Sequence, residues 1–319
     1  MARPPSALVF AYHNVGVRCL RVLAAAGVEI RLVVTHADRP DETIWFDSVA
    51  ATAAELGIPS IAPEHLDEAA LQGPSGAEAP DFIFSFYYRQ MLPASVLQMA
   101  GRGAYNMHGS LLPKYRGRVP VNWAIIEGET RTGATLHEMV AKPDAGAIIG
   151  QTEVPILPDD TALEVFQKVT VAAEVTLWKS LPDLLAGSAV RRPNELALGS
   201  YFGGRRPEDG RIDWGAPAQR VYNLVRALAP PYPGAFCEVR GRRLVITRAR
   251  LLWRGSGAQD NGPHENGAQD AGDLAPGLAV RDNRILGVCG DGGALLILRL
   301  VHDSREITPL ELAALLYSS

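Results

Sequence analysis

The sequence predicts an α/β domain built on a parallel sheet, followed by a small β-barrel domain. Three observations support this fold class. In residues 1–203, short β-branched or aromatic segments alternate with apolar-periodic segments of helical length, which is typical of stacked βαβ units. In residues 204–319, the segments become short and strand-like, with turn residues between them. The length of 319 residues corresponds to about two domains of roughly 150 residues each.

The elements of the first domain follow from apolar runs bounded by glycine and other turn residues. Strands are expected at 6–11, 28–35, 58–62, 81–86, 104–108, 134–140 and 147–156. Helices are expected at 17–26, 44–56, 93–100 and 160–185. Asp160 is the expected N-cap of the long helix.

The second domain is placed at 204–319, after a boundary within 191–207. Its expected strands are GRIDW at 210–214, AFCEVRG at 235–241, RRLVITRARLLW at 242–253, ILGVCG at 285–290 and GALLILRLVH at 293–302. Residues 254–276 are rich in Gly, Asp, Asn and Ala, so we expect a flexible insertion there.

Composition and charge narrow the function classes. Lys and Arg number 31 against 35 Asp and Glu, and this net charge of -4 disfavours a protein devoted to nucleic-acid binding. The 3 cysteines form no CxxC pair, which argues against a disulfide framework or a zinc cluster and favours a reducing compartment. The sequence has no run of about 18 apolar residues, so we expect no membrane span. These features predict a cytoplasmic, soluble protein and leave its oligomeric state open.

Several common site motifs are absent or incomplete. The first βα turn, AYHNVG at 11–16, lacks the GxGxxG glycines that let a dinucleotide pyrophosphate approach the backbone. The sequence has no GxxxxGK[ST] phosphate loop. His137 and Glu138 begin an HExxH pattern that fails at Ala141, and Ser110 lies outside any GxSxG elbow. Dehydrogenase, metalloenzyme and hydrolase functions are therefore disfavoured.

Asn106, His108 and Asp144 form a constellation with a definite chemical use. Asn106 and His108 lie two residues apart at the end of an expected strand, so both side chains face the crevice at the carboxyl edge of the sheet. Asp144 follows the next strand, in a loop that Pro143 and Gly146 indicate. An amide and an imidazole can stabilise an oxyanion while a carboxylate orients the imidazole and takes up a proton, which suits acyl transfer to an amine. The alternative is structural: a hydrogen-bonded strand end and a turn-forming aspartate.

The same residues carry a resemblance to a known family. Asn106-x-His108-x-Ser110-Leu-Leu-Pro113, with Asp144 in a downstream Asp-Ala-Gly loop, resembles the signature of the 10-formyltetrahydrofolate-dependent formyltransferases. Further matching segments cover nearly the whole chain: FAYHNVG, THADRP, FSFYYR at 84–89, SLLPKYRGRVPVNW, HEMVAKPDAGAIIGQ and PPYPGAF at 230–236. FSFYYR and PKYRGR are most similar to the branch that acts on UDP-4-amino-4-deoxy-L-arabinose.

The resemblance implies a fold, a cosubstrate and site residues. The family has an N-terminal Rossmann-like domain without a dinucleotide and a C-terminal barrel of the oligonucleotide-binding type. Its catalytic roles would fall on Asn106, His108 and Asp144, with 10-formyltetrahydrofolate as formyl donor and no metal. Its folate contacts would fall on the loop before Asp144 and on Tyr88, Arg89, Gln90 and Met91. Some relatives carry an NAD-dependent decarboxylase domain, which we expect this chain to lack, and the 254–276 insertion is not part of the family pattern.

A basic loop follows the Asn-x-His pair. Arg116 and Arg118 lie just past the expected catalytic strand, where a nucleoside diphosphate would place its charge beside the reacting sugar. Arg can bind phosphate oxygens with two donors at once, so these two residues are the expected substrate-binding residues. Asn122, on the segment that follows, is expected to join them. The alternative for these side chains is simple solvation.

We therefore predict formyl transfer to the 4-amine of UDP-4-amino-4-deoxy-L-arabinose, a step of lipid A modification that confers resistance to cationic antimicrobial peptides. The expected partners are the two small-molecule substrates, with no membrane and no nucleic acid. The alternative is methionyl-tRNA formyltransferase, which shares the signature and needs a positive surface. A basic run keeps this alternative open: Arg240, Arg242, Arg243, Arg248, Arg250 and Arg254. A third reading, an inactive nucleotide-sugar binding module, is disfavoured by the intact trio.

Overall fold

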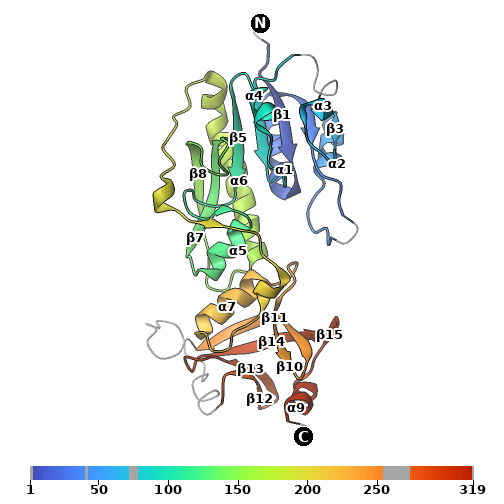
Figure 1. Ribbon diagram of the computed structural model, residues 1–319, viewed down its shortest axis with the longest axis vertical. Coiled ribbons are helices and arrows are strands. Elements are labelled where there is room, and N and C mark those ends of the chain that lie inside the picture. Colours follow the sequence, from blue (N-terminus) through green and yellow to red (C-terminus); the bar gives the residue numbers. More distant parts are fainter. Residues whose placement is uncertain (1–2, 40–41, 72–77, 254–273, 318–319) are drawn as a thin grey trace. The chain divides into compact units, whose positions relative to one another are not determined.

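The computed structural model describes residues 3–39, 42–71, 78–253 and 274–317. The chain divides into two compact units (Figure 1). The N-terminal unit comprises Met1–Pro120, Arg131–Pro155 and Phe166–Gly203, and the C-terminal unit comprises Val121–Thr130, Ile156–Val165 and Gly204–Ser319. The segments 121–130 and 156–165, which the sequence assigned to the first domain, thus pack with the second. Most of the expected insertion at 254–276 lies outside the described residues.

A seven-stranded sheet forms the centre of the N-terminal unit, in the order β3-β2-β1-β4-β5-β7-β8. β1 to β5 are parallel, which confirms the predicted α/β fold. β7 runs antiparallel to both of its neighbours, β5 and β8, so the sheet is mixed where a parallel one was expected. A parallel connection from β5 to β7 would need a crossover segment packed on the sheet. Residues 121–130, which belong to the chain between β5 and β7, instead pack with the C-terminal unit. The strands are Ser6–Ala11, Glu29–Val34, Ser60–Ile61, Phe82–Phe86, Gly103–His108, Arg131–Glu138 and Ile148–Pro155.

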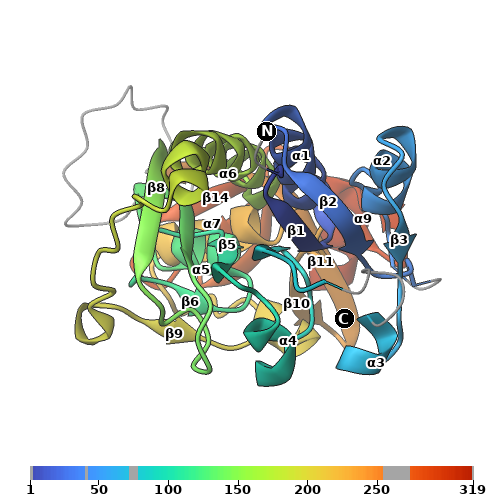
Figure 2. The same cartoon turned by 90° about the horizontal axis from the view of Figure 1, so that it is seen from above.

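Helices cover both faces of this sheet (Figure 2). α1 (His13–Ala25), α2 (Val49–Glu55) and α6 (Ala162–Ala186) lie on one face, and α3 (Glu68–Leu71) and α4 (Ala94–Gln98) lie on the other. The second face is sealed by a core cluster in which Leu8, Phe10, Leu32 and Ile83 of the strands pack with Val96 of α4, among others. This burial fixes the strands whose carboxyl ends carry the site.

Some helix boundaries differ from the predicted ones because side chains decide them. α2 begins at Val49 instead of 44, since the Ser48 hydroxyl accepts the Ala51 N–H at 3.2 Å and caps the helix there. α6 is capped by Thr161, whose N–H donates to the Glu164 carboxylate at 2.6 Å. Asp160, the predicted cap, instead accepts the Leu157 N–H at 2.6 Å.

The C-terminal unit is an antiparallel sheet in the order β10-β11-β14-β13-β12, with β15 paired to β14. β10 and β12 do not pair with each other within the described residues, so the sheet is a half-barrel, of the predicted class but open. α7 (Ala218–Ala227) packs on β11 and β14, and α9 (Pro309–Tyr317) packs on β12 and β13. Residues 210–214, expected as a strand, contribute an isolated bridge from Arg211 to Phe236. The strands are Ala235–Val239, Arg242–Trp253, Gly277–Arg281, Arg284–Val288, Ala294–His302 and Arg305–Glu306.

Short elements shape the loop that follows β5. β6 (Arg116–Gly117) pairs in parallel with β9 (Tyr201–Phe202), and α5 (Pro120–Ile126) follows. Two further short helices, Leu196–Leu198 and Pro207–Gly210, flank β9. The β6–β9 pair anchors the loop to a distant stretch of chain, which keeps it close to the end of β5.

Candidate active site

The predicted trio comes together at the edge of the N-terminal sheet. Asn106 and His108 lie at the carboxyl end of β5, and Asp144 lies in the loop between β7 and β8. The Asp144 Oδ1 atom lies 3.5 Å from His108 Nδ1. The structure thus brings an amide, an imidazole and a carboxylate to one place.

Asp144 is held by its neighbours on three sides. Its Oδ2 atom accepts the Gly117 N–H at 2.8 Å, and its backbone carbonyl accepts the Asn194 Nδ2–H at 3.0 Å. Its φ of 48° is in the left-handed region, which few non-glycine residues adopt. Burial disfavours its ionised form, but the attraction it gains when a neighbouring imidazole is protonated and the Gly117 hydrogen bond prevail, so the pKa of Asp144 lies below its ordinary value. Asp144 is therefore ionised at neutral pH.

His108 is buried, with an exposed fraction of 6%. Its Nε2 lies 2.8 Å from the Tyr115 carbonyl oxygen, so the ring hydrogen is on Nε2, and Nδ1 faces Asp144. Burial lowers the pKa of His108 and outweighs the opposing pull of Asp144. The ring is thus neutral, with a basic nitrogen directed at a carboxylate that can stabilise a proton there.

His137 belongs to the same cluster, and sequence reasoning did not select it. It lies opposite Asn106 in the β5–β7 register, and its Nε2 is 3.1 Å from Asn106 Nδ2 and 3.5 Å from Asp144 Oδ1. Its Nδ1 lies 2.8 Å from the Glu138 carbonyl oxygen, which places the ring hydrogen on Nδ1 and leaves Nε2 to accept from the amide. His137 thus fixes the orientation of Asn106. In the sequence it was visible only as half of a failed HExxH motif.

Hydrogen bonds hold the turn that follows His108. The Thr135 hydroxyl donates to the Ser110 carbonyl at 2.6 Å and accepts the Leu112 N–H at 3.1 Å. Gln151 Nε2 donates to the Leu112 carbonyl at 2.9 Å. The Ser110 hydroxyl donates to the Lys114 carbonyl at 2.7 Å. Ser110 and Thr135 thus act as structural polar groups that set the path of the loop.

The predicted folate segment follows β4, the strand next to β5. Tyr88 stacks on His36 at 4.1 Å between ring centroids, and its buried hydroxyl has no hydrogen-bond partner within the described residues. Arg89 pairs with Glu42 through Nη1–Oε2 at 2.8 Å. Gln90 reaches the Glu64 carbonyl at 3.4 Å, and Met91 is 64% exposed. The side chains of Arg89, Gln90 and Met91 are exposed beside the stacked ring of Tyr88, so this segment has surface available to a ligand. Its role in folate binding stays a prediction.

The predicted substrate residues have different environments. Arg116 is 8% exposed, yet within the described residues its Nε has no hydrogen-bond partner and its guanidinium makes no ion pair. Burial of an unpaired cation is unfavourable, so the environment of the Arg116 side chain favours an anionic partner. Arg118 is exposed. Asn122 belongs to the C-terminal unit and donates to the Ala227 carbonyl at 2.8 Å, which gives it a packing role there.

An aromatic cluster lies where β1 ends. His13 has a φ of 67°, and its ring lies 4.0 Å from Phe46, 4.5 Å from Trp45 and 4.6 Å from Phe166, measured between centroids. Burial among these rings lowers the pKa of His13 to about 3. Sequence periodicity cannot find such a cluster, because its members come from three separate segments.

Other sites are not found in the described part of the chain. No group of three or more His, Cys, Asp or Glu side chains there could hold a metal ion. None of the helices described has the length and hydropathy that a bilayer-spanning segment requires. The three cysteines are buried and unpaired, and burial raises the pKa of each thiol, which makes them unreactive.

Two family models match the chain. One, described as "Formyl transferase", matches residues 18–181, and the other, "Formyl transferase, C-terminal domain", matches residues 205–314. The first contains the trio, and the second covers most of the half-barrel.

Solved structures share the fold. One is the N-formyltransferase from Helicobacter canadensis in complex with folinic acid and dTDP-3-aminofucose, with a TM-score of 0.69 and 17% identity over 92% of this chain and 99% of that one. Another is a sugar 3N-formyl transferase in the presence of dTDP and 5-N-formyl-THF, with a TM-score of 0.68 and 18% identity over 95% and 100%. A 4-N formyltransferase from Francisella tularensis has a TM-score of 0.62 and 21% identity over 76% and 97%.

The buried site predicts a defined pH dependence of stability. The folded-state pKa of His108 lies below its unfolded value of about 6.5, so the unfolded chain binds more protons as the pH falls past about 6.5. Stability is therefore complete above about pH 6.5 and decreases below it. Denaturant unfolding between pH 7 and 4.5 should show this decrease, and His108→Gln should reduce its slope by up to about 1.4 kcal/mol per pH unit. An unchanged slope in His108→Gln, with exposed His65→Gln as control, would contradict the account.

Proposed function

The chain belongs to the formyltransferase family, and we propose that it transfers the formyl group of 10-formyltetrahydrofolate to the 4-amine of UDP-4-amino-4-deoxy-L-arabinose. The observation that carries this proposal is the buried cluster in which Asp144 faces the Nδ1 atom of His108, with Asn106 alongside. This cluster supplies a donor for an oxyanion and a base for an amine proton without a metal.

The proposed reaction is a direct transfer. The neutral amine attacks the formyl carbon, a new C–N bond forms, and a tetrahedral oxyanion develops. One N–H of the Asn106 amide donates to His137, and the other donates to that oxyanion. The His108–Asp144 pair takes up the amine proton and delivers it to N10 as the C–N10 bond breaks, which yields the formamide and tetrahydrofolate. Since both His108 nitrogens face protein oxygens here, its direct contact with the oxyanion stays a prediction.

Two observations support the proposed substrates. Segment 88–91, with its exposed Met91, and the loop before Asp144 offer surface for folate. The buried unpaired guanidinium of Arg116 supports an anionic acceptor such as a nucleoside diphosphate sugar. Of the solved structures named above, one is in complex with dTDP-3-aminofucose and another was solved in the presence of dTDP. The choice of UDP-4-amino-4-deoxy-L-arabinose, with its role in lipid A modification and cationic peptide resistance, rests on the sequence resemblance alone. The cytoplasmic location is proposed from the cysteine usage and the apolar pattern of the sequence.

Methionyl-tRNA formyltransferase is the second candidate function. It is favoured by exposed arginines on β11 of the C-terminal unit, such as Arg243 and Arg248, since long RNA needs a positive surface. It is disfavoured by the net charge of -4.

An acceptor panel with 10-formyltetrahydrofolate tests the proposal. The panel contains UDP-4-amino-4-deoxy-L-arabinose, other UDP- and dTDP-linked amino sugars, and charged initiator methionyl-tRNA. The highest kcat/KM should belong to the UDP-linked 4-amino sugar. Comparable turnover of the tRNA would replace the proposal with the second candidate.

Substitution of the trio should abolish most turnover. Asn106→Ala, His108→Ala and Asp144→Ala should each lower kcat by about 10²–10³, because each removes a group that acts on the transition state. Steady-state kinetics measure the effect, and circular dichroism checks that each variant is folded. The exposed His65→Ala serves as control. Full activity in a folded His108→Ala variant would remove His108 from the mechanism.

His137 should act through Asn106. His137→Phe keeps the ring but removes the acceptor of the Asn106 amide, so kcat should fall by at least about tenfold while both KM values change little. His137→Gln retains an acceptor oxygen and should recover part of the loss. A purely structural role would be indicated by equal losses in both variants together with a lowered unfolding midpoint.

Arg116 should determine the affinity for the acceptor. Arg116→Ala should raise the KM for the sugar nucleotide by at least about tenfold, or roughly 1.4 kcal/mol, and change the KM for folate far less. Arg118→Ala should act in the same direction. Exposed Arg131→Ala is the matched control. Equal defects toward both substrates would show that the loop is structural and binds no phosphate.

A further inference from the structure

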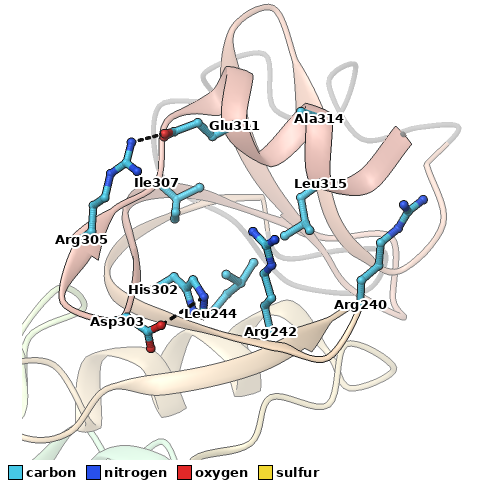
Figure 3. A pocket seen from close by; sticks show the side chains of 10 residues that line it. All are labelled: Arg240, Arg242, Leu244, His302, Asp303, Arg305, Ile307, Glu311, Ala314 and Leu315. Atoms are coloured by element: carbon cyan, nitrogen blue, oxygen red, sulfur yellow. Dashed lines mark hydrogen bonds and ion pairs between the residues drawn. The ribbon is translucent and has the colours of Figure 1, made fainter. Parts of the chain in front are cut away.

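The C-terminal unit contains a cavity of about 760 Å³ that the proposed function does not use (Figure 3). It is lined by the β10–β11 turn, the segment that joins β14 to α9, and α9 itself. Ile307 and Leu315 form its apolar wall, the fully buried Leu244 lies behind them, and Arg240 and Arg242 lie at its rim. A volume of this size is in the range of small-molecule sites.

The carboxylates that line the cavity already have partners. Glu311 forms an ion pair with Arg305 and accepts the Thr308 N–H at 2.9 Å, where it caps the start of α9. Asp303 lies 3.4 Å from the imidazole of His302, and its side chain is 89% exposed. Glu311 is therefore neutralised by Arg305, and within the described residues Asp303 makes no ion pair with Arg240 or Arg242.

Two arginines remain. Within the described residues, the Arg242 guanidinium makes no hydrogen bond and no ion pair, and Figure 3 shows it reaching toward Leu315 across the cavity. Arg240 makes a single long contact of 3.4 Å from Nη2 to the Leu316 carbonyl. The cavity thus combines two available guanidinium groups with an apolar wall.

We propose that this cavity binds a small phosphate-bearing molecule with a flat or apolar body, of the nucleoside diphosphate class. A guanidinium group binds phosphate oxygens with two donors at once, so two of them at one rim suit a diphosphate. Ile307 and Leu315, which are partly exposed, would cover the base or sugar and exclude water from it. The cavity lies wholly within the C-terminal unit, so this site goes beyond the proposed function and is independent of the trio.

Hydrogen exchange on the full chain tests the site, with UDP as the ligand and no folate or amino sugar present. UDP should protect the peptides that contain 240–244 and 302–316. Uridine, which lacks phosphate, should not protect them. Arg240→Ala/Arg242→Ala should raise the dissociation constant for this protection by at least about tenfold and leave the formyl-transfer kcat unchanged. Since no turnover is needed, the result is independent of the proposed function.

A matched double variant, Arg220→Ala/Arg248→Ala, removes the same charge from exposed positions outside the cavity. It should bind UDP like the wild type. The proposal is overturned if UDP protects neither segment, if the two double variants lose binding equally, or if uridine protects as well as UDP. It is also overturned if an RNA oligonucleotide protects these segments and UDP does not, because the surface would then serve nucleic acid.

Discussion

The site depends on the partly buried carboxylate of Asp144. Its Oδ1 atom lies 3.5 Å from both His108 and His137, and its Oδ2 atom accepts the Gly117 N–H. The Gly117 N–H stabilises this carboxylate as an anion, and a proton on either imidazole would be stabilised by it in return. These contacts join β5, β7 and the loop after β5 into one unit. The same charge stabilises a proton on His108, which is what transfer from an attacking amine requires.

The direction of β7 is the second constraint. β7 runs antiparallel to β5, and in this register His137 lies opposite Asn106 while Thr135 lies opposite His108. The antiparallel return places the side chains of Asn106 and His137 in register and sends the following loop, with Asp144, back over His108. The reversal follows because the intervening segment 121–130 packs with the C-terminal unit and provides no crossover helix on the sheet.

Asn106 and His108 could be placed together from sequence because residues two apart on a strand share a face. The α/β fold was visible in the same way, through periodicity. Asp144 has no such spacing, and its place in the trio came from its position after the next strand and from the family resemblance. Strand direction and the packing of Asn122 against Ala227 were not visible, since each depends on which distant segment lies nearby. His137 escaped for the same reason, as its partner is 31 residues away in the chain. The Thr161 cap in place of Asp160 is a local contact with Glu164, three residues away, that the sequence analysis did not select.

A single-turnover experiment with 10-formyltetrahydrofolate labelled in the formyl carbon tests direct transfer most closely. Enzyme in excess is mixed with labelled donor and UDP-4-amino-4-deoxy-L-arabinose, then quenched at increasing times. The account predicts that label leaves the folate and enters the sugar amide at the same rate, with none on protein, and that both rates fall together in Asp144→Ala. Transient label on the protein, or label that remains on folate in the presence of the amino sugar, would contradict it.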